Sequence, residues 1–454
     1  MGLARTGLST VRFLTARGAD VIVSDIREES ALEKAAEEAR MLGAALDLGR
    51  HSEERFRSAD LVIVSPGIPW RLPALETARR DGIPVMSEIE LAIRFLKGRI
   101  AGITGTNGKT TTTALAAAML SASGLSARAC GNIGTPLLEM VGGDSESSVY
   151  AVELSSFQLE GIIRFRPAAA VVVNLSPDHL DRYADYAGYA AAKARIFANQ
   201  EGDDIAILNA ADPDSSKLRS AVKVRLRQFS SLGPVEDGAF LHEGHIILAG
   251  QGRTEPLMPA GEVPLPGRHN LENVMAAALA ALHLGASAPA IRRAVATFRS
   301  LPHRLEHVGQ VDGVDYYNDS KATNVGATIT SLESFPHRRV LIILGGRDKG
   351  GDFTQLRPLL ERRATAVLLI GEATELIERQ IAGAAPIVRT GQLAAAVAEA
   401  RRLATSGDVV LLAPGCASFD QYHDYEERGD HFRSLVAALG GGAGGPDGPH
   451  GTEA

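Results

Sequence analysis

The residues best suited to chemistry stand together in the stretch 99–113, where a short apolar run meets three glycines, then Lys109 and a run of four threonines at 110–113. Glycines at 102, 105 and 108 let the backbone turn tightly, so that N–H groups and the positive end of a following helix converge on an anion. Lys109 would supply a charge for the β- and γ-phosphates of a nucleotide, and the Thr110 hydroxyl would bind its Mg²⁺. Ile103 replaces the first glycine of the strict pattern, and an ordinary glycine turn is the alternative. The strand and helix patterns on either side favour a phosphate loop.

Further polar groups follow in the same part of the chain. Glu153 lies inside the apolar run 149–154, where a carboxylate is costly to bury unless it is paired or binds a cation, so we expect a metal ligand. Asp178 and Asp181 follow the strand 169–174, and either could simply cap the next helix. Lys193 lies on that helix, predicted over 186–198, and taken alone it indicates a solvated helix face.

The elements that must position these residues alternate between strand and helix over 98–300, which predicts a mostly parallel central sheet. Residues 204–265 are predicted to form short strands with polar turns and show no site pattern. Asn270 and Asn273 open an alanine-rich helix that runs to about 284. Capping explains Asn270 more simply than Asn273, and contact with a ligand is the alternative for both.

The first part of the chain, residues 1–97, looks like the second half of a βαβ nucleotide-binding unit. A glycine loop opens a helix over 5–17, and the strand 20–25 ends at Asp25, where such folds place a polar group near a ribose or base. An unliganded turn is the alternative. The first strand of the unit should precede the loop, and the sequence begins inside the loop. Either the start is trimmed or assigned too late, or the domain folds with one strand fewer.

The third part, residues 301–439, repeats the α/β pattern with strands at 314–318, 340–344, 366–370, about 386–389, and 409–413. Polar, glycine-containing turns follow three of them, and their repetition along one sheet edge predicts a ligand site. From residue 440 to 454 the glycine-rich tail cannot bury a core, and we expect it to be disordered.

Length and composition limit the number of domains, the partners and the cellular location that this chain can have. The chain has 454 residues, of which 45% are hydrophobic and 22% charged, and the length prior favours about three domains. A net charge of −7 without a basic block argues against a nucleic-acid partner. Cys130 and Cys416 lack metal or disulfide spacing, which fits structural thiols in a reducing cytosol. No apolar run is long enough to span a membrane, and no signal peptide is recognisable, so we expect a cytoplasmic protein without membrane insertion.

Seven motifs together resemble those of the Mur ligases of peptidoglycan synthesis, and two of them, Glu153–Gln158 and Asn318–Asn324, match the branch that adds D-glutamate. They are Gly105–Thr110, Glu153–Gln158, Asp178–Tyr183, His269–Asn273, Leu301–Arg304, Asn318–Asn324 and Cys416–Gln421. The resemblance implies three α/β domains: an N-terminal Rossmann-like domain (1–97), a central domain of the P-loop ATPase type with a mostly parallel sheet (98–300), and a C-terminal Rossmann-like domain (301–439). It also implies an ATP-driven amide bond: a substrate carboxylate takes the γ-phosphoryl group of ATP, and the amine of D-glutamate then displaces phosphate.

The resemblance also implies residue roles. The catalytic residues would be Lys109, His179 and Lys193, and Mg²⁺ would be bound by Thr110, Glu153, His179 and Lys193, the lysine being carbamylated. ATP would contact Gly105, Thr106, Asn107, Gly108, Lys109, Thr110, Thr111, Asn270, Asn273, Arg304, Asp319 and Lys321. The UDP-linked substrate, UDP-N-acetylmuramoyl-L-alanine, would contact Arg5, Thr6, Asp25, Ile26, Arg27, Gly67, Asn132 and His179. D-Glutamate would contact Thr323, Lys349, Ser418 and Tyr425.

Only small-molecule partners and a monomer are expected. Sister ligases that add L-alanine, a diamino acid or a dipeptide, and folylpolyglutamate synthase, share the same ATP chemistry and would differ in substrate. A catalytically silent ATP-binding scaffold is the alternative of another class. Retention of Lys109, Glu153, His179, Lys193 and Lys349 argues against such a loss of chemistry.

Overall fold

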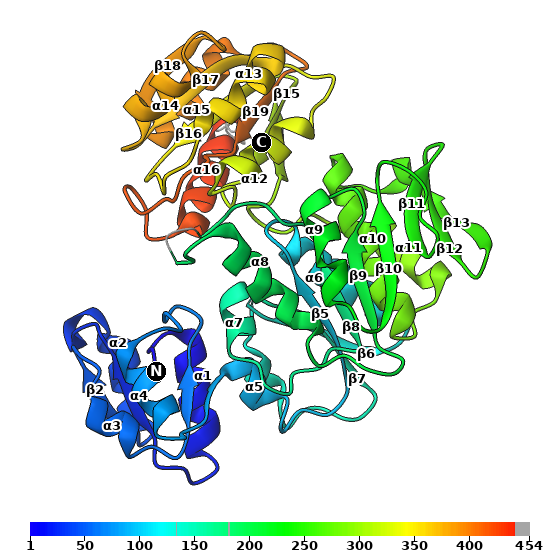
Figure 1. Cartoon of the computed structure of the whole chain (residues 1–454). Helices are drawn as coiled ribbons and strands as arrows, with labels where there is room; N and C mark the ends of the chain where they lie inside the picture. The colour runs from blue at the N-terminus through cyan, green and yellow to red at the C-terminus, as the bar shows by residue number, and fades with distance from the viewer. Residues whose placement is uncertain (133, 180–181, 441–454) are drawn as a thin grey trace, which may run out of the picture. The chain divides into compact units, whose positions relative to one another are not determined.

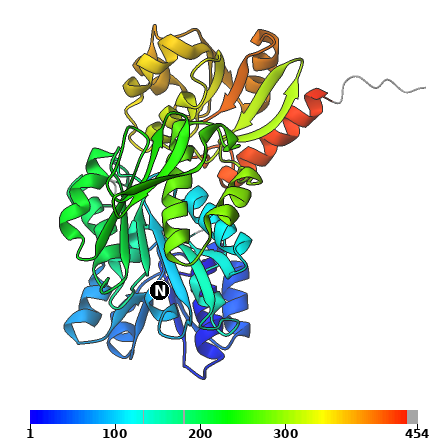
Figure 2. The same cartoon turned by 90° about the vertical axis from the view of Figure 1, so that its right-hand side faces the viewer.

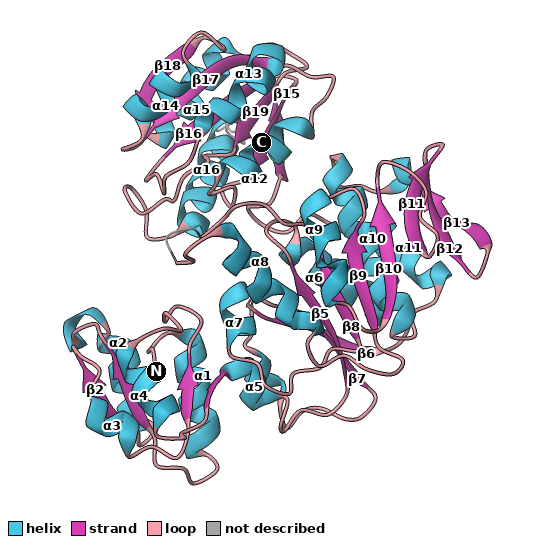
Figure 3. Cartoon of the chain, in the orientation of Figure 1, coloured by secondary structure: helices cyan, strands magenta, loops and turns pink. Residues whose placement is uncertain are grey.

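The computed structural model describes residues 1–132, 134–179 and 182–440. They form two compact units (Figure 1). One unit comprises residues 1–264 and 270–298, and the other comprises 265–269 and the chain from 299 onward. Both are mixed α/β, with helices placed against strands (Figure 3). The boundaries at 97, 300 and 439 stay predictions.

The N-terminal part of the first unit is built on two small parallel sheets, and helices follow or precede each strand. Its helices bury alanine and leucine faces against Val23, Leu3 and Val62. The strands are β1 (Ile22–Asp25), β2 (Ala45–Leu48), β3 (Val62–Val64) and β4 (Val85–Ser87), and the helices are α1 (Arg5–Thr15), α2 (Glu33–Met41), α3 (Glu53–Arg57) and α4 (Pro73–Arg80).

The first two residues bridge these sheets. The Met1 amino group donates to the Ile63 carbonyl at 2.8 Å, and the Ser65 N–H donates to the Met1 carbonyl at 3.0 Å. On the other side, the Gly2 N–H donates to the Ser24 carbonyl at 2.8 Å. No strand precedes α1 among the described residues, yet Met1 and Gly2 occupy the position between β1 and β3 that a first strand would fill.

The central sheet of the first unit has nine strands in the order β13-β12-β11-β10-β9-β8-β5-β7-β6. Pairing is parallel from β6 to β11 and antiparallel across β11, β12 and β13. The mostly parallel sheet predicted from the alternating pattern is therefore present. Its strands are β5 (Arg99–Thr104), β6 (Ser126–Gly131), β7 (Ser148–Glu153), β8 (Ala169–Val172), β9 (Ile205–Asn209), β10 (Arg225–Ser230), β11 (Gly238–His242), β12 (His245–Gly250) and β13 (Arg253–Pro259).

Seven helices accompany this sheet, and none of the helices in the described ranges is long and apolar enough to cross a bilayer. The predicted helix over 186–198 ends as an α-helix at Ala194 and continues as a 3₁₀ turn over Arg195–Phe197. The helices are α5 (Glu88–Ala92), α6 (Lys109–Ala122), α7 (Ser156–Glu160), α8 (Tyr186–Ala194), α9 (Pro213–Lys217), α10 (Arg268–His283) and α11 (Ala288–Ala296).

The second unit is a six-stranded sheet in the order β14-β15-β19-β16-β17-β18. Alternate residues of β16 enter different cores: Ile342 and Leu344 lie in one cluster, and Leu341 and Ile343 in the other. Burial on both faces explains why this strand is a continuous apolar run. The strands are β14 (Glu306–Val311), β15 (Val314–Asn318), β16 (Val340–Gly345), β17 (Ala364–Ile370), β18 (Ile387–Gly391) and β19 (Val409–Leu412), and the helices are α12 (Val325–Glu333), α13 (Arg357–Arg363), α14 (Thr374–Ile381), α15 (Leu393–Leu403) and α16 (Tyr425–Gly440).

All five strands predicted for this part are present, and the antiparallel edge strand β14 was not predicted. Helix α16, red in Figure 2, packs beside β14. Gly440, predicted as the first residue of the tail, is instead the last residue of α16. The remainder of the predicted tail, 441–454, lies outside the described residues.

Two buried glutamates on the short helix α5 join the N-terminal part to the central sheet. Glu90 Oε2 accepts hydrogen bonds from the backbone N–H groups of residues 163, 164 and 165 at 2.8–2.9 Å. Glu88 Oε1 accepts the Leu138 N–H at 2.6 Å, while its buried Oε2 has no hydrogen-bond partner in the described part of the chain. Burial raises the pKa of Glu88 to about 7.

We expect Glu88→Gln to remove a pH dependence of stability. Between pH 4.5 and about 7 the folded chain keeps a proton on Glu88 that the unfolded chain releases, so the free energy of unfolding falls as pH rises through this window. The loss above pH 7 is on the order of 3 kcal/mol at most. Thermal unfolding should therefore show the variant several degrees more stable than the parent at pH 8, with the difference shrinking at pH 5. The exposed Glu33→Gln is the control, and parallel pH curves for both variants would contradict this prediction.

Candidate active site

The predicted phosphate loop is a strand, a glycine turn and a helix, formed by β5, residues 105–108 and α6. Gly105 has φ of 151° and Gly108 has φ of 77°, backbone conformations that side chains disfavour. A Cβ atom on Gly108 would also lie 2.4 Å from Asn273 Oδ1. Glycine is therefore required at residue 108 for both conformation and space.

Lys109 folds back over this loop. Its Nζ donates to the carbonyl oxygens of Gly105 at 2.9 Å and Thr106 at 2.8 Å. Lys109 is also the first residue of the 14-residue helix α6, so its ammonium group lies near the positive end of the helix dipole. A cation, oriented N–H groups and a helix N-terminus therefore lie together, which is the chemistry that binds phosphate.

Asn174, which the sequence argument passed over, holds the loop in place. Its Oδ1 accepts the Asn107 N–H at 2.8 Å, and its Nδ2 donates to the Asn107 carbonyl at 3.1 Å. The backbone carbonyl of Asn174 accepts the Thr106 N–H at 2.9 Å. A polar residue directly after an apolar strand was the available signal for this role.

The two asparagines of α10 contact the loop helix. Asn273 Oδ1 accepts the Thr112 hydroxyl at 3.2 Å, and Asn273 Nδ2 donates to Asn270 Oδ1 at 3.0 Å. Both side chains are buried. The pair thus fixes one turn of α10 against the start of α6, beside the phosphate loop.

Lys193 lies in this site and not on a solvated face, so the interpretation from its helix alone was wrong. Its side chain is fully buried, and Nζ donates to the Gly105 carbonyl at 2.6 Å and to Thr104 Oγ1 at 3.4 Å. Burial, followed by the nearby charge of Lys109, holds the pKa of Lys193 well below its usual range. A lowered pKa favours the uncharged, nucleophilic form of the amine.

Glu153 is the last residue of β7, one residue before the predicted end of the strand, in a buried position. Its Oε1 accepts Asn132 Nδ2 at 2.9 Å, whereas Oε2 is buried without a hydrogen bond to any described residue. A buried carboxylate oxygen of this kind is suited to a hard cation. Asn132 is exposed and touches the same carboxylate.

His179 follows β8 in a strained backbone conformation, with φ of 55°. Its ring packs edge-on against Phe157 with centroids 4.9 Å apart, and its side chain is 45% exposed. Asp178 accepts the His179 N–H and does not cap the next helix, because Asp185 caps α8 by accepting the Gly188 N–H at 2.8 Å. Asp181 lies outside the described residues.

The residues predicted for a uridine site gather in the N-terminal part. Asp25 is buried and accepts the Leu3 N–H at 2.7 Å and Arg27 Nη2 at 2.7 Å, and these partners hold its pKa near 2. Ile26 is 60% exposed beside this pair. The other predicted residues, Arg5 and Thr6 at the start of α1 and Gly67 in the turn after β3, are exposed or half-buried.

Arg304, Asp319 and Lys321 lie in the second unit, where Asp319 and Lys321 follow β15. Burial raises the pKa of Asp319, while the Ser331 hydroxyl and the charge of Arg304 act to lower it. Lys321 Nζ lies 3.6 Å from the ring centroid of Tyr425, which opens α16. The unit thus brings predicted nucleotide and predicted D-glutamate residues together.

The remaining predicted D-glutamate residues are on turns after the strands of this sheet. Lys349 is exposed, Thr323 is half-buried, and Ser418 is buried. Arg428, which the sequence argument missed, is fully buried and donates to Ser320 and to the Cys416 carbonyl at 2.8–3.3 Å. It therefore ties the turn after β15 to the turn after β19.

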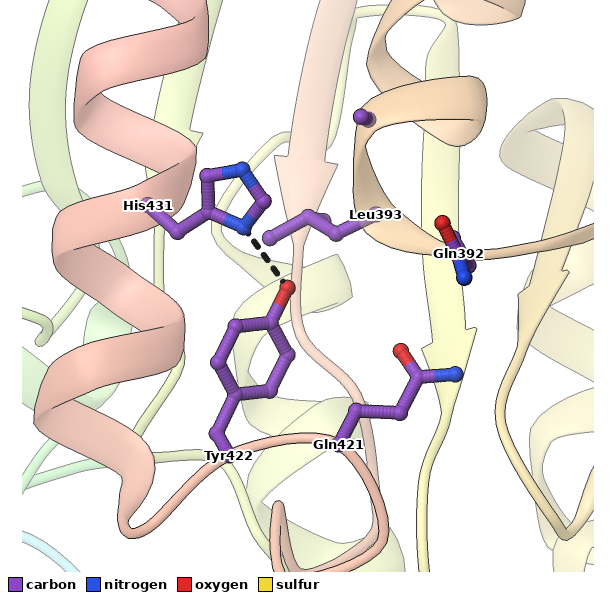
Figure 4. Close-up of a pocket in the computed structure, with 6 residues that line it drawn as sticks. Gln392, Leu393, Gln421, Tyr422 and His431 are labelled. Atoms are coloured by element: carbon purple, nitrogen blue, oxygen red, sulfur yellow. Dashed lines mark hydrogen bonds between the residues drawn. The ribbon is translucent and has the colours of Figure 1, made fainter.

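A pocket of about 330 Å³ lies next to the second of these turns. Figure 4 shows the Tyr422 hydroxyl pointing at His431 Nδ1, 2.8 Å away. None of the predicted site residues lines this pocket, whose walls are Gln392, Leu393, Ala394, Gln421, Tyr422 and His431.

Family models match the chain in three consecutive stretches. Residues 1–87 match "Mur ligase MurD-like, N-terminal domain", residues 103–281 match "Mur ligase middle domain", and residues 303–416 match "Mur ligase, glutamate ligase domain". The chain belongs to the Mur ligase family. It therefore has the three-domain α/β fold of a Mur ligase, as expected from the motifs.

Curated relatives of this Mur ligase are similar over nearly its whole length. A protein of Acidobacterium capsulatum named UDP-N-acetylmuramoylalanine--D-glutamate ligase is 47% identical over 445 residues, covering 98% of this chain and 96% of the relative. A protein of the same name from Geotalea daltonii is 46% identical, with 97% of each chain covered.

Solved structures share the fold at lower identity. The pseudomurein peptide ligase type C of Methanothermus fervidus superposes with a TM-score of 0.62 at 18% identity, covering 96% of this chain and 98% of that one. A MurF ligase of Thermotoga maritima, solved in complex with ADP, gives 0.61 at 18% identity and covers 94% and 97%. At these identities the likeness supports the Mur ligase fold alone.

Proposed function

We propose that this Mur ligase joins D-glutamate to UDP-N-acetylmuramoyl-L-alanine at the expense of ATP, in the synthesis of peptidoglycan precursors. The observation that carries the proposal is the name shared by curated relatives that are 45–47% identical over 97–98% of the chain. We place the reaction in the cytosol, in keeping with two buried thiols, Cys130 and Cys416, that form no disulfide.

In the first step, an oxygen of the L-alanyl carboxylate attacks the γ-phosphorus of ATP, and the bond from that phosphorus to the bridging oxygen of ADP breaks. This brings anions together, so positive charge must already be in place. Lys109 and the start of α6 supply it within the first unit, with Asn174 and Asn273 holding the loop. The family resemblance assigns the other nucleotide contacts to Gly105, Thr106, Asn107, Gly108, Thr110, Thr111, Asn270, Arg304, Asp319 and Lys321.

In the second step, the D-glutamate amine attacks the carbonyl carbon of the acyl phosphate, loses a proton and displaces inorganic phosphate. The amino acid carries two carboxylates, which suits a site with cations. We assign its binding to Lys349, Thr323, Ser418 and Tyr425, which the second unit places on turns after its strands and at the start of α16. The UDP-linked substrate is assigned to the N-terminal residues together with Asn132 and His179.

The residues present suit Mg²⁺. Glu153 Oε2 is buried without a hydrogen bond among the described residues, and Thr110 adds a buried hydroxyl beside the loop. Mg²⁺ bound there would neutralise charge on the phosphates. The uncharged amine of Lys193, which its lowered pKa favours, would add to CO₂, forming an N–C bond and releasing a proton, and the resulting carbamate would give a second oxygen ligand close to Glu153. We assign His179 to the same ligand set.

Phosphate release from ATP tests this function directly. We expect release only when UDP-N-acetylmuramoyl-L-alanine and D-glutamate are both supplied, and none when L-glutamate replaces D-glutamate. Release with another amino acid would assign the chain to a different Mur ligase activity. If no acceptor amino acid supports phosphate release while an ATP analogue binds normally, the result would favour a non-catalytic scaffold.

A further inference from the structure

Arg182 connects the predicted uridine side of the first unit to the residues around His179. Its Nη1 donates to the Pro66 carbonyl at 3.0 Å, and its Nη2 donates to the Ile68 carbonyl at 2.6 Å. These carbonyls flank Gly67 in the turn that follows β3. The planar guanidinium thus spans a turn that lies more than a hundred residues earlier in the sequence.

The other face of Arg182 is fixed inside the central part of the unit. Its guanidinium carbon lies 3.7 Å from the ring centroid of Phe157, and Nη2 lies 3.6 Å from Glu160 Oε2. Phe157 is the same ring that packs edge-on against His179. Only 14% of the Arg182 side chain is exposed, so the interactions are made in a largely desolvated place where they are strong.

A second contact holds the same turn. A Cβ atom on Gly161, which ends α7, would lie 2.8 Å from the Trp70 ring and 2.6 Å from the Ser87 N–H. Trp70 therefore rests directly on the end of the helix that carries Phe157 and Glu160. The 66–70 segment therefore contacts the central part of the unit in two places. One is the pair of hydrogen bonds from Arg182, and the other is the packing of Trp70 against the end of α7.

We propose that Arg182 is a positioning residue for the UDP-linked substrate, setting the 66–68 turn at a fixed place relative to Phe157 and His179. This rests on the proposed function, in which Gly67 and His179 both meet that substrate. Arg182 acts through the turn and through Phe157. Lysine cannot replace it, because a single ammonium group cannot span two carbonyls and stack on a ring as a guanidinium does.

The test compares Arg182→Lys and Arg182→Met with the parent enzyme. We expect the KM for UDP-N-acetylmuramoyl-L-alanine to rise at least about tenfold in both, the loss expected for one charged hydrogen bond. The KM for ATP should stay within about twofold. Calorimetric titration of the UDP-linked substrate, without ATP, should show the same loss of affinity and separates binding from turnover.

Arg195→Lys is the matched control. Arg195 also donates to two backbone carbonyls, those of Leu159 at 2.8 Å and Ile162 at 2.7 Å, but both lie in the central part of the unit. We expect this control to lower the unfolding temperature as much as Arg182→Lys does while leaving the affinity for the UDP-linked substrate unchanged. Equal losses of affinity in both variants, or a rise in the KM for ATP matching that for the UDP-linked substrate, would overturn the inference. An inactive parent enzyme would instead contradict the proposed function.

Discussion

Lys109→Ala is expected to lower turnover by at least about 100-fold while leaving the fold intact. A loss of turnover of this size is typical when one preorganised group that stabilises charge in the transition state is removed. The Nζ atom of Lys109 sits over the phosphate loop, bonded to the carbonyls of Gly105 and Thr106. These are weaker acceptors than a triphosphate, so Nζ can exchange them for β- and γ-phosphate oxygens when ATP binds. The variant loses the charge that offsets the approach of the substrate carboxylate.

The fold should survive because the loop has other supports. Asn174 bonds to Asn107 in both directions, and the Thr106 hydroxyl bonds to the Ser176 carbonyl at 3.1 Å. Alanine is also a good residue for the first turn of a helix. Steady-state phosphate release, thermal unfolding and titration of the UDP-linked substrate should be measured together. The exposed Lys34→Ala is the control, and a Lys109→Ala enzyme within tenfold of the parent, at normal stability, would eliminate the proposed role of this lysine.

The parts of this fold that the sequence predicts are those fixed by local composition. Strand β16 is an uninterrupted apolar run because both of its faces are buried. The phosphate loop can be recognised in the sequence because its backbone requires glycine at residues 105 and 108. Edge strand β14 was not predicted because Glu306–Val311 mixes polar and apolar residues, as a strand paired on one side only can. Its pairing with β15 is what makes it a strand.

The parts of the site that the sequence does not predict depend on distant contacts. Asn174 is one polar residue after a strand, and its role exists only because residue 107 lies next to it. Arg182 reaches carbonyls at 66 and 68, and a backbone carbonyl carries no side-chain signal. Lys193 stands among alanines, which give its helix no clear apolar face, so its direction is set by packing against Thr104 and Gly105. Only the resemblance to a family placed it in the site.

Lys193→Met is expected to lower turnover by roughly 100-fold or more, the scale of losing a ligand to a charge-stabilising cation. Methionine has nearly the length of lysine and no polar end, so it should fill the same buried space. Because the burial cost of the amine disappears, the variant should unfold at a temperature no lower than the parent. Loss of turnover with retained stability would identify a chemical role and exclude a packing role.

The carbamate makes a prediction that a simple buried amine does not. Since adding CO₂ to the amine releases a proton, acid and removal of CO₂ should reverse the modification. The parent enzyme, held at pH 6 in CO₂-free buffer and assayed at once at pH 8, should lose activity and regain it with bicarbonate. A carbon-13 signal from labelled bicarbonate should appear on the parent protein and be absent from Lys193→Met. The exposed Lys217→Met should behave as the parent does. Activity that does not depend on bicarbonate, together with no labelled signal, would mean that Lys193 acts as an unmodified amine donating to Gly105 and that the metal is held by the remaining ligands.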